Sequence, residues 1–139
     1  MTRERAIRCL FILWVSASLV ATLVVSMQIL SGKYGEDGQL ALNWLLIQYT
    51  PILSVLLAAV FSDPSKRWRE GVANQWRFRW ALAISIFQIL LMLCLLLLQP
   101  FFGAYSVTVF SVFESTQPIL AILQGLGVAA VGSVIFDGR

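Results

Sequence analysis

Residues 62–80 read SDPSKRWREGVANQWRFRW, and this stretch decides how the chain is organised. It holds five of the ten Lys and Arg residues against two acids, and long apolar runs flank it on both sides. A basic segment between apolar runs is typical of a loop that joins membrane helices. The sequence therefore predicts two membrane hairpins, one before and one after residues 62–80.

The composition supports a membrane protein of one domain, residues 1–139. Apolar residues make up 59% of the chain and charged residues 12%, whereas soluble domains carry about 25% charge. The chain has no His, which removes the commonest metal ligand and the base that titrates near neutral pH. It also has no phosphate-binding glycine loop, no paired catalytic carboxylates and no Cys/His cluster. We therefore expect no enzyme activity, no cofactor and no metal site.

The predicted fold class is an all-α integral membrane protein with four transmembrane helices. The first apolar run, Cys9–Leu30, carries no charge and exceeds the 7–15 residues or so of a signal-peptide core, so we expect a retained helix. A glycine-rich turn over residues 31–39 follows it. Pro51 lies inside the second run and should kink that helix. The predicted spans are 9–30, 40–61, 81–98 and 118–136.

The start of the fourth span has two interpretations. Pro118, preceded by Ser115 and Thr116, is typical of a helix start. A span over 118–136 already fits the hydrocarbon thickness, and it leaves 100–117 as a connection with Glu114 in a loop. The alternative starts the helix near Tyr105 and places Glu114 inside the bilayer. We favour the shorter span, while an intramembrane Glu114 would be a functional residue.

The basic stretch itself predicts an amphipathic helix over residues 64–80, lying in the membrane interface. Trp68, Val72, Trp76 and Trp80 recur every four positions on one face, and the other face carries Arg67, Glu70, Asn74 and Arg77. Tryptophan beside arginine is the usual interfacial anchor. We expect it to bind anionic lipid headgroups or a cytosolic protein rather than nucleic acid, through Arg67, Trp68, Arg69, Trp76, Arg77 and Arg79.

The basic residues also predict the orientation. Three lie in the N-terminal tail, five in residues 62–80 and one at Arg139, whereas Lys33 stands alone in the first hairpin turn. Cytoplasmic loops carry the excess of Lys and Arg. The chain is therefore expected in a bacterial-type inner membrane with both termini in the cytoplasm. Such a bias argues against a dual-topology multidrug transporter, which needs a nearly even split.

The fourth apolar run contains small residues at every fourth position. Such a ridge lets another helix backbone approach closely, which is how helices associate in lipid. Two partners remain open: the first span, which offers Ser18, Thr22 and Ser26, or a neighbouring subunit. The ridge consists of Ala121, Gly125, Ala129 and Ser133.

Polar residues recur on one face of each of the last three runs. Amides in hydrocarbon need hydrogen-bond partners. Other helices can supply these partners, or water can supply them in a lumen around an oligomer axis. These faces are Gln39, Asn43, Thr50 and Ser54; Ser85 and Gln88 with Met92; and Gln117 with Gln124. The lumen candidates are Asn43, Thr50, Gln88, Gln117 and Gln124.

These features favour a homo-oligomeric membrane component. It would be a pore or channel-like subunit, a membrane effector, or the membrane-anchoring subunit of a larger complex. In layout alone the chain is similar to small bacterial membrane effectors of the holin or phage-exclusion kind, which implies a role in antiviral defence by analogy. The alternative is a small proton- or cation-coupled transporter that uses Glu114.

The charge bias gives a testable orientation. A membrane-impermeant thiol reagent should label a cysteine placed at Lys33 from outside the cell and should not label one placed at Arg69. The reverse labelling pattern would overturn the prediction, because the positive charges would then lie outside.

Overall fold

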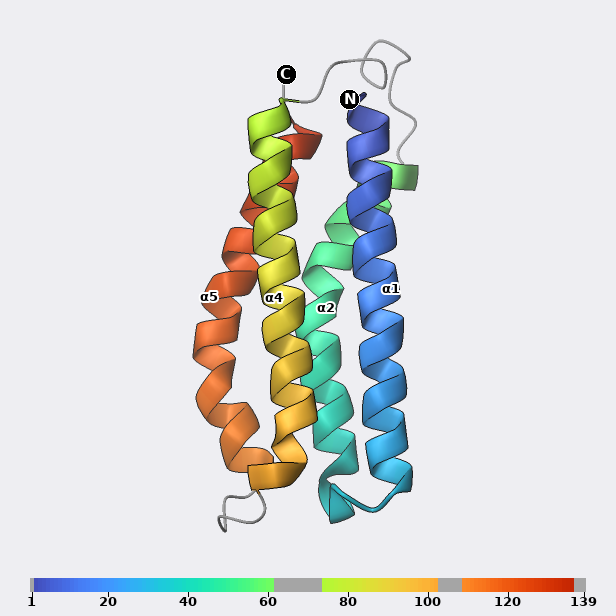
Figure 1. The fold of residues 1–139 in the computed structure, drawn as a ribbon, viewed down its shortest axis with the longest axis vertical. Coiled ribbons are helices and arrows are strands. Elements are labelled where there is room, and N and C mark those ends of the chain that lie inside the picture. The colour runs from blue at the N-terminus through green and yellow to red at the C-terminus, as the bar shows by residue number, and fades with distance from the viewer. Residues whose placement is uncertain (1, 62–73, 103–108, 137–139) are drawn as a thin grey trace.

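Four long helices form the described part of the chain, residues 2–61, 74–102 and 109–136 of the computed structural model. They pack as two hairpins, α1 with α2 and α4 with α5, and the four helices stand side by side in a bundle (Figure 1). Around the bundle the order is α1, α2, α5, α4. The elements are α1 (Arg3–Leu30), the short 3-10 helix η1 (Gly35–Asp37), α2 (Gly38–Phe61), α4 (Gln75–Phe102) and α5 (Val109–Ile135).

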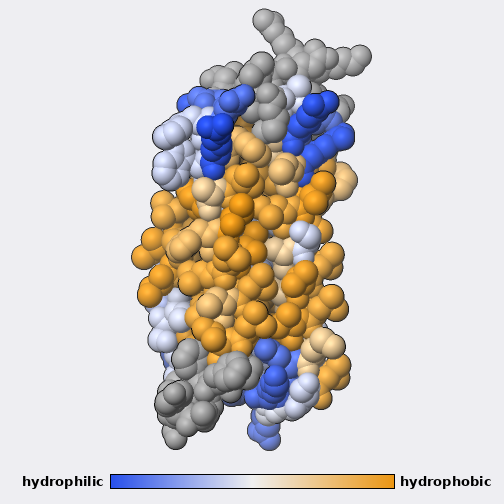
Figure 2. Space-filling model, in the orientation of Figure 1, coloured by the Kyte–Doolittle hydropathy of each residue, from blue (hydrophilic) through white to orange (hydrophobic). Residues whose placement is uncertain are grey.

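All four helices are long and apolar enough to span a membrane. The 28 residues of α1 extend about 42 Å at 1.5 Å per residue, which exceeds a hydrocarbon core of about 30 Å. Large apolar side chains point outward along the helices, for example Leu23 and Met27 at 64% and 70% exposure. Figure 2 shows them as an apolar belt between hydrophilic ends. The protein is a small polytopic membrane protein.

The first hairpin turns through two glycines in the left-handed region. Gly32 has φ 70° and Gly35 has φ 55°, which other residues adopt only with strain. The Lys33 N–H donates to the Gln28 carbonyl at 3.0 Å and so closes the end of α1. We call this end of the bundle the turn end, and the end where α1 begins and α5 ends the terminal end (Figure 1).

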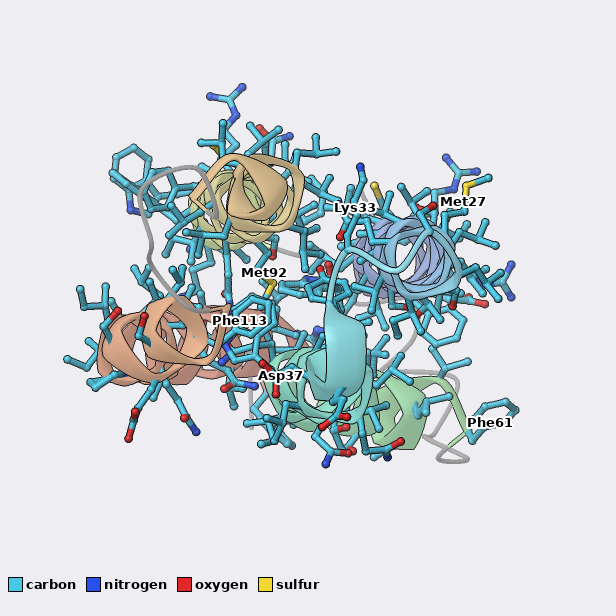
Figure 3. All side chains as sticks on the ribbon, turned by 90° about the horizontal axis from the view of Figure 1, so that it is seen from below. Met27, Lys33, Asp37, Phe61, Met92 and Phe113 are labelled. Atoms are coloured by element: carbon cyan, nitrogen blue, oxygen red, sulfur yellow. The ribbon has the colours of Figure 1, made fainter. Side chains whose placement is uncertain are left out.

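Side chains fill the interior of the bundle. The largest fully buried ones include Trp14 of α1, Ile52 of α2, Met92 of α4 and Leu120 of α5. Figure 3 shows Met92 and Phe113 directed toward the space between the helices. Since bulky side chains occupy the centre at several levels, the structure gives a packed core rather than an open channel through the described part of one chain.

The structure tests only the last residues of the predicted interfacial helix. Residues 62–73, with Arg67, Trp68 and Arg69, lie outside the described residues. The chain from Gln75 onward is already α4, so Trp76, Arg77 and Arg79 form its first turns rather than a separate helix. Asn74 caps this helix, because its Oδ1 accepts a hydrogen bond from the Trp76 N–H at 3.0 Å.

The start of the last helix is also earlier than the favoured prediction. Helix α5 begins at Val109 and contains Pro118, so Glu114 lies on a helix and not in a loop. The prediction of a helix start at Pro118 is wrong. A proline removes one backbone hydrogen bond, and membrane helices tolerate that loss when neighbouring groups compensate.

Candidate functional site

A layer of polar side chains crosses the middle of the bundle, and every helix contributes to it. In this layer the Trp14 indole N–H donates to Ser85 Oγ at 3.0 Å, and the Trp14 ring meets Tyr49 edge-on with centroids 5.8 Å apart. Each side chain is at least 92% buried. The central polar layer consists of Trp14, Gln48, Tyr49, Ser85, Gln88 and Gln124.

Gln124 has a specific task in this layer. Pro51 of α2 has no backbone N–H, so the carbonyl four residues earlier, on Ile47, loses its helical donor. The Gln124 side-chain N–H₂ donates to the Ile47 carbonyl at 3.0 Å and to the Gln48 carbonyl at 2.9 Å. An amide on α5 thus satisfies the carbonyl that the proline of α2 leaves without a partner.

The same arrangement recurs between α1 and α4. Pro100 lies in α4 and withholds a donor from the carbonyl of Leu96. The Gln28 amide donates to this carbonyl at 3.0 Å, and its oxygen accepts from the hydroxyl of Tyr34. Burial raises the pKa of Tyr34 to about 12, so the hydroxyl remains a donor even in mildly alkaline solution.

Other atoms of the central polar layer have no hydrogen-bond partner among the described residues. They are both amide atoms of Gln88, the Oε1 of Gln48 and the hydroxyl of Tyr49. Burying an amide without a partner costs about 1–3 kcal/mol on protein scales. The layer therefore contains hydrogen-bonded groups that stabilise the bundle and buried groups without partners that destabilise it. Buried polar groups without partners are unusual in a purely structural core.

Gly127 makes room for the Gln88 amide. A Cβ at Gly127 would lie 2.7 Å from Gln88 Oε1 and 3.1 Å from Ile52 Cδ1. At Gly125, two residues away on the same helix, a Cβ would meet no atom within 4 Å. The close approach of α5 to the bundle interior therefore depends on Gly127, whereas Gly125 lies on the outer surface.

A cleft opens between α2 and α5 near the turn end. Its volume is about 220 Å³. Trp44 and Phe113 stack with ring centroids 4.7 Å apart, and both are 5% exposed, so they form a fixed aromatic wall. This α2–α5 cleft is lined by Leu40, Asn43, Trp44, Ile47, Phe113, Glu114 and Gln117.

The structure separates the lumen candidates into two groups. Gln88 and Gln124 lie in the central polar layer, whereas Asn43, Thr50 and Gln117 are exposed on the outside of the bundle. They do not surround a common space within one chain. The small-residue ridge also faces outward: Ala121, Gly125 and Ala129 are exposed and Ser133 is half-buried.

Several residues of the site were missed in the sequence. Gln28, Gln48, Tyr49 and Trp44 give no local pattern that distinguishes them from ordinary buried residues. One usable signal exists, because a proline at position i inside a membrane helix predicts an unsatisfied carbonyl at i−4 and hence an amide partner on a neighbouring helix.

Among the described residues no three His, Cys, Asp or Glu side chains gather. Cys9 and Cys94 are free thiols exposed on the outer surface of the bundle. Comparison with family models, curated proteins and solved structures finds no match for the chain. The features that can carry a function are the central polar layer, the α2–α5 cleft and the outer faces.

The proline-compensating role of Gln124 can be measured with a double-mutant cycle. Gln124→Leu should lower the free energy of unfolding by about 1–3 kcal/mol, because the Ile47 carbonyl then lacks a donor. In a Pro51→Ala background the loss should be smaller, since alanine restores the backbone N–H. Gln117→Leu, at an exposed position on the same helix, serves as the control with little effect. Equal losses in both backgrounds would contradict the proposed role.

The amide of Gln88 should respond in the opposite sense. Gln88→Leu removes two buried atoms that have no partner among the described residues, so thermal unfolding in detergent should occur at the same or a higher temperature. Gln124→Leu is the matched comparison, since it changes the same residue type in the same layer. A loss of stability as large as that of Gln124→Leu would show that Gln88 has a partner in the membrane.

Proposed function

We propose that the protein is a homo-oligomeric membrane component in which copies surround a polar path. One chain has a packed interior, with Trp14, Ile52 and Leu120 fully buried. A path for ions or small solutes therefore has to lie between chains. The outer faces of α2 and α5 are the best candidates to line it.

The observation that carries this proposal is the group of polar side chains exposed on α2 and α5. Asn43, Glu114 and Gln117 are exposed, and they lie together around the α2–α5 cleft. A carboxylate and two amides on membrane helices are costly to expose to hydrocarbon. A water-filled path around an oligomer axis would hydrate them, with Thr50 and Ser54 farther along α2.

The small-residue ridge supplies the contact between copies in this proposal. Ala121, Gly125 and Ala129 are exposed, and a side chain added at Gly125 would meet nothing in its own chain. Neighbouring helices approach closely over such surfaces, because dispersion is the main attraction between helices in lipid. This contact would hold subunits of a pore, of a membrane effector or of the anchoring part of a larger complex.

The basic residues at the terminal end add a second contact to the proposal. Trp76 and Trp80 are exposed at the start of α4 and meet edge-on with centroids 5.4 Å apart. Arg77 and Arg79 lie between these two Trp residues in the sequence and are also exposed. We propose that this end lies at the cytoplasmic face of a bacterial-type inner membrane, where it contacts anionic headgroups or a cytosolic protein.

Cation-coupled transport by a single chain is the second candidate, and the α2–α5 cleft favours it. Glu114 is on a helix beside this cleft, where a carboxylate can take up a proton or a cation. The two functions differ in the effect of Glu114→Gln. A pore keeps its conductance with altered ion selectivity, whereas a coupled transporter loses accumulation of its substrate.

The oligomer is tested by two glycine variants of α5. Gly125→Leu should reach the membrane in normal amount and run as a smaller particle in detergent, because leucine separates neighbouring copies. Gly127→Leu should reduce expression, because the side chain collides with Gln88 and Ile52 inside the chain. Particle mass is measured by light scattering and subunit contact by crosslinking. Wild-type particle size for Gly125→Leu would remove the main support for the oligomer.

A further inference from the structure

The volume of the α2–α5 cleft suits a ligand smaller than a typical drug molecule. Its volume of about 220 Å³ lies below the 300–1,000 Å³ or so of pockets for drug-sized molecules. It is built entirely from one chain, with lining residues from α2 and α5. A ligand the size of a lipid headgroup or a simple amine fits this space.

The lining selects the charge and the type of the ligand. Glu114 is the one charged residue in the lining, and Asn43 and Gln117 add neutral amide oxygens. An anion would be repelled by the carboxylate. A divalent metal ion prefers several carboxylate or carbonyl oxygens, whereas here a single carboxylate stands beside aromatic and aliphatic walls. These walls suit a cation that carries carbon groups.

The aromatic wall strengthens this selection. Trp44 stacks on Phe113 with an interplanar angle of 25°, and the rings are held in place by burial. Because Trp44 is 5% exposed and Phe113 covers one of its faces, the two rings meet a ligand as an apolar wall that suits carbon groups. Leu40 and Ile47 provide apolar contact for the alkyl part of a ligand.

We propose that the α2–α5 cleft binds a small organic ammonium ion. The Glu114 carboxylate balances its charge, the amide oxygens of Asn43 and Gln117 accept hydrogen bonds from any N–H it carries, and the aromatic and apolar walls cover its carbon atoms. The cleft lies near the turn end, so the ammonium group comes either from a free amine or from the headgroup of an aminophospholipid.

This inference goes beyond the proposed function and does not require an oligomer. The cleft is complete in one chain, so binding is measurable whether or not copies assemble. In the proposed pore, the same residues lie near the mouth of the path, and an ammonium ion bound there would reduce the current. Ammonium binding in a protein that conducts no current would contradict the proposed pore and would still support the ammonium site.

The test uses the full chain purified in detergent, with tetramethylammonium chloride and choline chloride as probes. Both should raise the thermal unfolding temperature in a saturable way, and sodium chloride at equal ionic strength should not. Glu114→Gln should weaken the apparent affinity at least tenfold, and Gln117→Leu should weaken it less. Glu36→Gln, at an exposed acid of the first turn, is the matched control and should leave the affinity unchanged.

The source of the ammonium group is distinguished in lipid nanodiscs. If a headgroup occupies the cleft, phosphatidylethanolamine should abolish the tetramethylammonium response that is seen in phosphatidylglycerol alone. If free amines are the ligands, the response should be the same in both lipids. Sodium chloride acting as well as the ammonium salts, or Glu114→Gln binding as tightly as the unmodified protein, would overturn the proposal.

Discussion

A backbone carbonyl that loses its donor inside a membrane must find another one, since lipid offers none. Pro51 in α2, Pro100 in α4 and Pro118 in α5 each create this need. For Pro51 and Pro100 a glutamine from the other hairpin supplies the donor, Gln124 to the Ile47 carbonyl and Gln28 to the Leu96 carbonyl. The two hairpins are therefore joined at the points where proline interrupts the backbone hydrogen bonds of a helix.

A further hydrogen bond also crosses from one hairpin to the other, because the Trp14 indole N–H of α1 donates to Ser85 Oγ of α4. Apolar contacts alone do little to fix which helix faces meet in lipid, because lipid tails contact an apolar helix face as well as another helix does. The directional bonds between hairpins thus determine which faces of the helices meet, and they leave the α2–α5 cleft near the turn end.

The sequence was sufficient for the four apolar helices and their hairpin pairing, because long uncharged runs and charged loops follow directly from the bilayer. It was not sufficient for the start of α5, because Ser115, Thr116 and Pro118 have the same pattern whether a helix begins there or is only kinked. The partners of Gln28 and Gln124 were equally hidden, since each lies more than sixty residues away in the chain. Such pairs depend on how the two hairpins pack against each other, and local sequence patterns do not predict that packing.

The central polar layer and the α2–α5 cleft meet at Ile47. Its carbonyl accepts the Gln124 amide, and the same residue lines the cleft beside Asn43 and Trp44. Because Pro51 prevents a helical hydrogen bond at this carbonyl, the local shape of α2 depends on the amide from α5 more than an unbroken helix would. The wall of the cleft and the hydrogen bond that joins the two hairpins therefore share one residue of α2, so the packing of α2 on α5 positions both.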